Sequence, residues 1–213
     1  IETPNLCNEH QISLYPPEIL KQLKVGDIIS LDFDAVLLQI IEIQPNSKAR
    51  VISSGSVGAN KAVTVIDRTP KIPCLSETDR EAIKIGNRLG IQYVALSFAN
   101  YSNDVLELRT LINDKIAIIS KIESWAGISN LNEILDVTDE ILIDRGDLSQ
   151  EVVIENIPYM QKEIIKKSNE KNVPVNVATN LLESMVHNTM PTRAEVNDVI
   201  NTLNDGADGL VLA

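Results

Sequence analysis

The fold is decided by residues 116–148, IAIISKIESWAGISNLNEILDVTDEILIDRGDL, in which two short apolar runs flank a helical segment. The runs at 116–121 and 140–143 have the length and composition of buried strands. The segment between them, at 127–135, carries apolar residues at helical spacing. A strand, a helix and a second strand in this order predict a parallel βαβ unit.

The same alternation continues on both sides of this stretch. Further strands are predicted at 93–97, 174–178 and 209–212, and helices at 77–89, 103–112, 157–169 and 193–204. Five strands with intervening helices indicate an α/β fold, built either as a barrel or as an open doubly wound sheet. Polar residues recur where successive strands end, and no Gly-x-Gly-x-x-Gly turn occurs. Both features favour an incomplete (β/α)8 TIM-barrel type with about five units.

Residues 1–71 have a different pattern. Short β-rich pieces at 27–31, 36–43, 50–53 and 62–66 are separated by Gly, Pro, Asn and Ser. We therefore predict a small β domain over 1–71, followed by the barrel part over 72–213.

Composition narrows the class of protein. The 213 residues are 44% hydrophobic and carry a net charge of −11, which argues against a nucleic-acid partner. No apolar stretch reaches the roughly 18 residues of a membrane span. Two cysteines, Cys7 and Cys74, predict reduced thiols and a cytoplasmic protein. With only His10 and His187 present, oxygen-ligand metal chemistry is easier to build than a zinc site.

Lys121 and Glu123 lie at the end of the strand predicted at 116–121. Side chains two residues apart on a strand point to the same face, so a cation and a carboxylate share one site. A salt bridge that closes the strand end and a catalytic pair both fit this pattern.

The next strand ends in Asp-Arg-Gly-Asp, where we expect Gly146 to allow an unusual backbone angle and Asp147 to lie at the mouth of the barrel. Carboxylates from adjacent strand ends, Glu123 and Asp147, suit Mg²⁺ or Mn²⁺. A turn or helix-capping role for Asp147 is the alternative.

Thr179 ends the following apolar strand. A threonine at a strand end can orient a proton through water, or it can simply satisfy its hydroxyl locally. The sequence leaves both readings open.

The motifs SKIES, DRGDLS, VATNLLESM and PTRAEVNDVINTLNDGAD, preceded by LSETDREAI and VALSF, resemble the pyruvate kinase family in order and spacing. The resemblance covers roughly residues 72–213. It extends more weakly to LKVGDIISLDFDAV and GANKAVTV, which look like part of the small β-barrel insert domain of that family.

The resemblance implies a phosphotransferase that moves a phosphoryl group between phosphoenolpyruvate and ADP, giving pyruvate and ATP in the last step of glycolysis. It implies that Lys121 stabilises the phosphoryl group in flight and that Glu123 and Asp147 hold the divalent metal. A Mg²⁺-dependent pyruvate lyase or aldolase, or a degenerate non-catalytic paralogue, is the alternative.

The resemblance also implies that Gly146, Asp147 and Thr179 contact the three-carbon substrate, with Thr179 assisting catalysis. It places Lys61 on the nucleotide side.

Several positions depart from the family pattern. These departures put substrate and nucleotide preference in doubt. The positions are Asp32-Phe33-Asp34, Asn100, Asp144, Ser149 and Asn180. A complete barrel typically needs about 250 residues, and the family's first three strands, which carry its K⁺ ligands and a phosphate-binding arginine, have no counterpart here. We therefore expect a homo-oligomer or a part of a longer chain.

Overall fold

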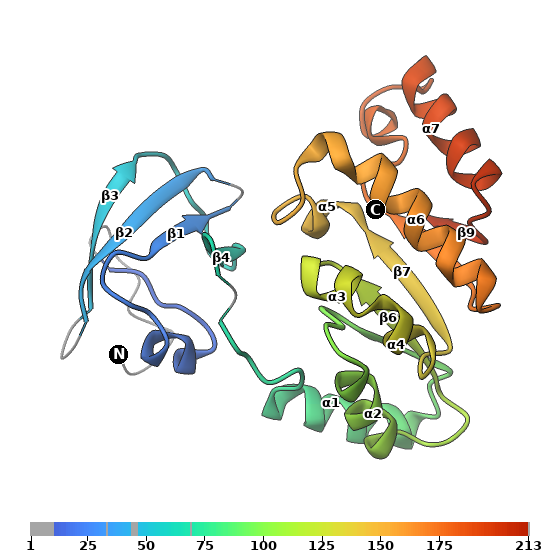
Figure 1. Ribbon diagram of the computed structural model, residues 1–213, viewed down its shortest axis with the longest axis horizontal. Helices are drawn as coiled ribbons and strands as arrows, with labels where there is room; N and C mark the ends of the chain where they lie inside the picture. Colours follow the sequence, from blue (N-terminus) through green and yellow to red (C-terminus); the bar gives the residue numbers. More distant parts are fainter. Residues whose placement is uncertain (1–10, 33, 44–46, 69, 213) are drawn as a thin grey trace. The chain divides into compact units, whose positions relative to one another are not determined.

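The structure, a computed structural model, describes residues 11–32, 34–43, 47–68 and 70–212, coloured by residue number in Figure 1. It divides into two compact units, Ile1–Pro73 and Cys74–Ala213. Cys7, His10 and Phe33 lie outside the described residues. Each unit has its own sheet and its own apolar core, so each is described by itself.

The first unit contains a four-stranded antiparallel sheet with the strand order β3-β2-β1-β4. Its elements are η1 (Pro17–Lys21), β1 (Ile28–Leu31), β2 (Val36–Glu42), β3 (Lys48–Ser53) and β4 (Val63–Val65). Along β2, Val36, Leu38 and Ile40 are buried and alternate with less buried residues. This two-residue period places one face of the sheet on a small core.

The second unit contains a five-stranded parallel sheet with the strand order β5-β6-β7-β8-β9. The strands are β5 (Tyr93–Leu96), β6 (Ala117–Ile122), β7 (Glu140–Asp144), β8 (Val175–Ala178) and β9 (Gly209–Val211). The helices are α1 (Glu77–Leu89), α2 (Ser102–Leu111), α3 (Trp125–Ser129), α4 (Leu131–Leu135), α5 (Arg145–Leu148), η2 (Ile154–Asn156), α6 (Ile157–Glu170), η3 (Glu183–Val186) and α7 (Arg193–Asn204). Because each strand pairs with its successor in the chain, the order matches a barrel wall and differs from a doubly wound sheet, whose order reverses.

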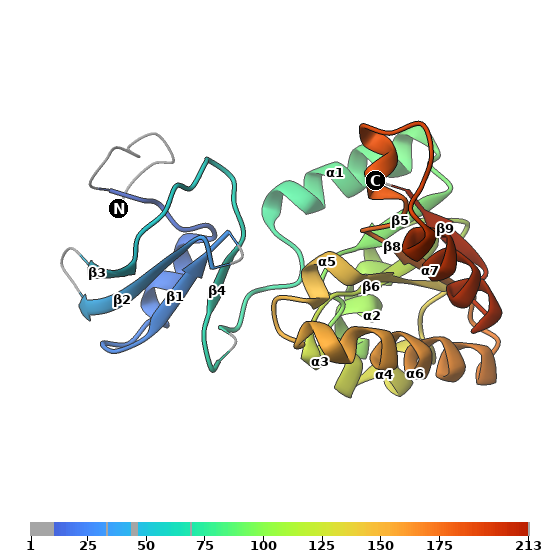
Figure 2. The same cartoon turned by 90° about the horizontal axis from the view of Figure 1, so that it is seen from above.

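The two faces of this sheet are covered unequally. Along β6, Ile118, Ser120 and Ile122 are buried, whereas the alternate residues are only partly buried. Figure 2 shows α4 and α6 along the same side of the sheet, and the core lies between strands and helices. The less covered face carries Lys121.

The helix expected at 127–135 is instead two short helices, α3 and α4, which meet at Asn130. The Asn130 side chain donates hydrogen bonds to the main-chain oxygens of Asn100 and Ala126, at 2.9 and 3.1 Å. This contact between Asn130 and Asn100, which lies in the loop before α2, interrupts the helix. The longest described helix, α6, has 14 residues, and none in the described part of the chain is long and apolar enough to cross a membrane.

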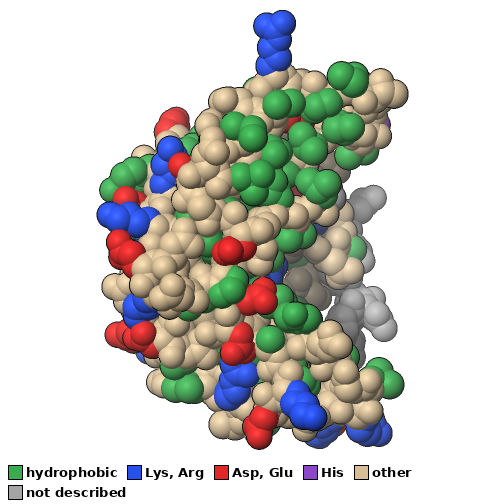
Figure 3. Space-filling model, turned by 90° about the vertical axis from the view of Figure 1, so that its right-hand side faces the viewer, with side chains coloured by type: hydrophobic (Ala, Val, Ile, Leu, Met, Phe, Trp, Pro, Cys, Tyr) green, Lys and Arg blue, Asp and Glu red, His purple; other side chains and the backbone are tan. Residues whose placement is uncertain are grey.

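Strand β9 is an edge of the sheet, because it pairs only with β8 among the described residues. Exposed apolar side chains are found on α7 and near the end of β9, and they are Val196, Ile200, Leu203, Val211 and Leu212. Hydrophobic side chains gather on one part of the face seen in Figure 3. Unpaired strands and exposed apolar side chains are features that favour association.

The Glu195 carboxylate in the first turn of α7 fastens the preceding loop to this helix. It accepts hydrogen bonds from the main chain and hydroxyl of Ser184, at 2.7 and 2.6 Å. It also completes a capping box with Thr192. The bonds to Ser184, followed by those to Thr192, lower the pKa of Glu195 from 4.5 to about 2.

This shift predicts a pH-dependent stability. A carboxyl group whose pKa is lower in the folded state stabilises the fold above its unfolded pKa, and the effect is lost as the pH falls through the folded value. The melting temperature should therefore exceed that of Glu195→Gln by a constant amount above pH about 6, and the difference should shrink as the pH falls from 4.5 toward 2. Circular dichroism melts over this range measure it. The exposed Glu170→Gln is the control, and a pH-independent difference for Glu195→Gln would contradict the assignment.

Candidate functional site

The carboxyl ends of β6, β7 and β8 bring the candidate residues together. Lys121 lies opposite Leu142 in the pairing of β6 with β7, and Asp144 lies opposite Ala178 in the pairing of β7 with β8. In a parallel sheet these strand ends share one edge, so residues far apart in the sequence meet there.

The Lys121 ammonium group lies between two carboxylates. Its Nζ is 2.5 Å from Glu123 Oε1 and 3.2 Å from Asp144 Oδ2. Burial by itself lowers the pKa of Lys121, but the hydrogen bonds and charges of Glu123 and Asp144 outweigh it and raise the pKa above its ordinary value. Lys121 is therefore a fixed positive charge at neutral pH.

Glu123 is the buried carboxylate of the site, with 1% of its side chain exposed. Its Oε2 accepts a hydrogen bond of 2.6 Å from the main chain of Phe98, a residue with a left-handed φ of 50°. Its Oε1 makes the ion pair with Lys121 and has no other polar partner among the described residues. Burial raises the pKa of Glu123, and the contacts with Lys121 and Phe98 only partly offset it.

Glu123, Asp144 and Asp147 form a group of carboxylates that could hold a metal ion. One oxygen from each lies within 4.8 Å of the others. Oxygen ligands and carboxylate charge are what Mg²⁺ and Mn²⁺ prefer, and the buried Oε1 of Glu123 has an unused hydrogen-bonding capacity. The residues present therefore fit a divalent cation.

Sequence reasoning missed Asp144 as a member of this group and treated it only as a departure from a family pattern. The available signal was its position. It is two residues beyond Leu142 on β7, so it shares the face of the sheet that carries Lys121.

Thr179 directly follows β8 and has a left-handed φ of 75°, which is unusual for a β-branched residue. Its hydroxyl donates a 2.7 Å hydrogen bond to Asp144 Oδ1. Its main-chain oxygen accepts from Nε and Nη2 of Arg145, at 3.1 and 2.7 Å. The hydroxyl is thus satisfied by a residue of the neighbouring strand, 35 positions away, and its role in orienting a proton stays a prediction.

The expectation of an unusual backbone angle at Gly146 is wrong. Gly146 lies inside α5, and its φ is not in the left-handed region. The small residue is needed for space, because an added Cβ would lie 2.8 Å from Thr179 Cγ2. Asp147, also in α5, accepts a 2.9 Å hydrogen bond from the Gln150 side chain.

Arg145 stabilises the segments that carry the site residues. Only 10% of its side chain is exposed, and its Nη1 contacts both carboxylate oxygens of Asp198, on α7, at 2.9 Å. Together with its bonds to Thr179, this guanidinium joins α5, the end of β8 and α7.

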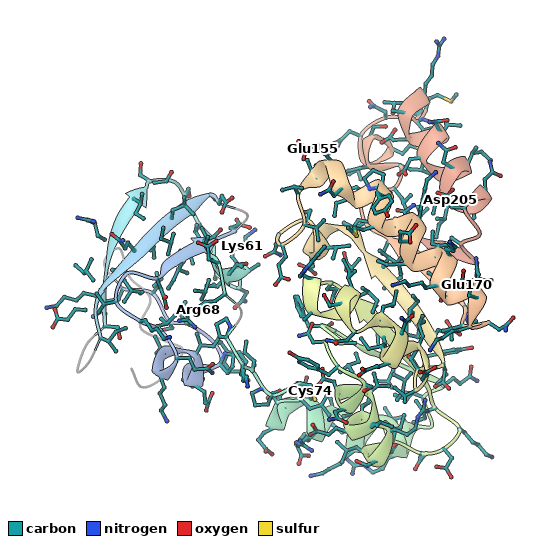
Figure 4. The ribbon with its side chains drawn as sticks, in the orientation of Figure 1. Lys61, Arg68, Cys74, Glu155, Glu170 and Asp205 are labelled. Atoms are coloured by element: carbon teal, nitrogen blue, oxygen red, sulfur yellow. The ribbon has the colours of Figure 1, made fainter. Side chains whose placement is uncertain are left out.

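Lys61 belongs to the first unit, where its ammonium group is 3.2 Å from Asp32 Oδ2 (Figure 4). Nothing in that contact bears on a nucleotide, so its binding role stays a prediction. Cys74, also labelled in Figure 4, begins the second unit. Burial, followed by its hydrogen bond to Glu107, raises the pKa of the Cys74 thiol to about 12, so it is not a nucleophile at neutral pH.

Two other residues that depart from the family pattern, Asn100 and Ser149, take part in hydrogen bonds. Asn100 accepts a hydrogen bond from the Ser124 hydroxyl, which also caps α3. The Ser149 hydroxyl donates a 2.6 Å hydrogen bond to the main-chain oxygen of Gly146.

A wall of parallel βα units with an acidic group and a lysine at its strand ends defines a barrel-type protein, a class in which ligands bind at the carboxyl ends of the strands. The chain matches the profile of the pyruvate kinase barrel domain over residues 2–213 and belongs to the pyruvate kinase family. This match confirms the family resemblance and the partial barrel predicted from the sequence.

Individual relatives support the same family assignment. The chain is 39% identical to a pyruvate kinase of Thermotoga maritima over 97% of its length, and 38% identical to one of Clostridium perfringens over 98%. It is 36% identical to pyruvate kinase 1 of Saccharomyces cerevisiae over 97%. These alignments cover 45%, 45% and 42% of the relatives, so the chain spans less than half of their length.

Replacing Arg145 by Lys should destabilise the fold by about 2 kcal/mol, because lysine keeps the charge but loses the planar fork that binds Asp198 and Thr179 together. Urea unfolding measures this change. Arg88→Lys on the exposed face of α1 is the matched control and should stay within about 0.5 kcal/mol of the wild type. Equal effects of the two substitutions would contradict the supporting role of Arg145.

Gly146→Ala should destabilise the fold by about 1–3 kcal/mol, because the new Cβ overlaps Thr179 Cγ2. Thr179→Ser removes that methyl group and keeps the hydroxyl. In the Thr179→Ser background, Gly146→Ala should therefore be neutral or slightly stabilising, since alanine favours the helix by about 1 kcal/mol. Urea unfolding of the four proteins checks this, and equal penalties in both backgrounds would refute the steric explanation.

Proposed function

We propose that this chain carries the lysine and metal part of a pyruvate-kinase-type site, which moves a phosphoryl group between phosphoenolpyruvate and ADP. The observation that supports it best is the Lys121 ammonium group held between Glu123 and Asp144, in an acidic group that also contains Asp147. Phosphoryl transfer needs positioning and neutralisation of oxygen charge more than covalent catalysis, and a fixed cation beside a metal site supplies both.

Each residue has a definite part in this proposal. Lys121 binds the phosphoryl oxygens in flight, and Glu123 and Asp147 hold Mg²⁺ or Mn²⁺. When bound, the divalent ion would neutralise charge on phosphoryl and enolate oxygens. Gly146, Asp147 and Thr179 contact the three-carbon substrate.

Thr179 has the proton-handling role in the proposal. Because its hydroxyl hydrogen points to Asp144, its oxygen lone pairs remain able to accept a hydrogen bond from a water molecule that carries the proton. The hydroxyl is thereby oriented before any substrate arrives.

The remaining parts of the proposal rest on the family. Lys61 contacts the nucleotide, the first unit corresponds to part of an inserted β domain, and the protein acts in the cytoplasm. Any K⁺ would be held by residues outside this chain.

A coupled assay of pyruvate formation from phosphoenolpyruvate and ADP, with and without Mg²⁺, tests the activity. The chain should be active only with the metal. Lys121→Met should lower the rate about 10²–10³-fold, because the charge that stabilises the transferring group is lost. Lys166→Met, an exposed lysine on α6, is the matched control and should leave the rate unchanged.

Other outcomes point elsewhere. Undiminished activity of Lys121→Met would refute its assigned role. Metal-dependent enolisation of pyruvate, seen as exchange of its methyl protons with deuterium oxide, without phosphoryl transfer to ADP would favour the lyase or aldolase. Metal binding without any turnover would favour a non-catalytic paralogue.

A further inference from the structure

Asp144 links three parts of the site. Its Oδ1 accepts the Thr179 hydroxyl at 2.7 Å, and its Oδ2 lies 3.2 Å from the Lys121 ammonium group. One of its oxygens also lies within 4.8 Å of ligand atoms of Glu123 and Asp147. Its side chain is 16% exposed, so these contacts are largely withdrawn from solvent.

The charges of the site do not balance. The group contains three carboxylates and one ammonium group, which pairs with Glu123 and Asp144, and this leaves two negative charges in excess. Partly buried carboxylates that lack a counter-charge are costly. One divalent cation would bring the sum to zero, whereas two carboxylates with Lys121 would need only a single positive charge.

Glu123 is the most deeply buried carboxylate of the group. Its side chain is 1% exposed, and its Oε1 has no polar partner among the described residues other than the Lys121 ammonium group. That ammonium group lies between Glu123 and Asp144, so these two carboxylates already share one cationic group in the structure. The geometry therefore shows that the oxygens of Glu123 and Asp144 are placed to bind a common positive charge.

We propose that Asp144 is a third carboxylate ligand, which makes this a three-carboxylate site for a divalent cation. The inference rests on the proposed metal site and adds a residue that the assignment of Glu123 and Asp147 leaves out. More carboxylate charge at a site with oxygen ligands raises its affinity for a divalent cation. The chain should therefore bind the ion more tightly with Asp144 than without it.

The competing explanation is that Asp144 only positions Lys121 and Thr179. Asp144→Asn separates the two, because the amide oxygen can still accept the Thr179 hydroxyl while the charge is lost. A structural role would lower the melting temperature and leave cation affinity unchanged, and a ligand role would weaken cation binding.

The test is a titration of the metal-free chain with Mn²⁺ alone, in which electron paramagnetic resonance measures the concentration of the free ion. Asp144→Asn should raise the dissociation constant about 10–100-fold, and Asp144→Ala should raise it at least as much. Asp114→Asn, an exposed site in the turn between α2 and β6, has the same change in charge and should bind as the wild type does. Asp147→Asn removes the charge of a ligand that the proposed metal site already includes, so its Mn²⁺ affinity shows whether the ion binds at this site.

Two results would overturn the proposal. Wild-type affinity in Asp144→Asn and Asp144→Ala, with binding lost in Asp147→Asn, would leave a metal site that does not use Asp144. Absence of saturable Mn²⁺ binding in the wild type would remove the site. Because the readout is binding and not turnover, tight binding that depends on Asp144 in an inactive chain would support this inference and contradict only the proposed phosphoryl transfer.

Discussion

The second unit depends on how one ammonium group is held between two carboxylates of an acidic group at the edge of a parallel sheet. Lys121 reaches Glu123 and Asp144, and Asp147 completes the acidic group. Such a cluster persists only where its members are held by the backbone, since like charges that are free to move would separate. Here the strand register provides that hold, because the carboxyl ends of β6 and β7 lie side by side.

Support for this cluster comes from residues that do not belong to it. Arg145 pairs with Asp198 and binds the main chain of Thr179, so it fixes the turn after β8. Thr179 and Phe98 both have left-handed backbone angles, and each contributes a hydrogen bond to a carboxylate of the site. Backbone strain of this kind is kept where the surrounding structure holds it, and it is found at functional sites.

Local pattern predicted the order of the elements well, because apolar periodicity is a property of neighbouring residues. It predicted a single helix over 127–135, and there it was wrong. Asn130 ends α3 by bonding to Asn100, thirty residues earlier, which no local pattern reports. The glycine at position 146 suggested a special backbone angle. The structure instead gives a steric reason for the small residue, because the methyl group of Thr179 lies where a Cβ would be too close.

The sequence by itself determined the succession of strands and helices, the family, and the identity of Lys121, Glu123, Asp147 and Thr179 as residues at or shortly after the ends of strands. Only the tertiary structure decided which of them meet. Asp144 entered the site in this way, since its partners Thr179 and Lys121 lie 35 and 23 positions away in the sequence. Strand register and parallel pairing bring such residues together, and both arise from hydrogen bonds between segments that are distant in the chain.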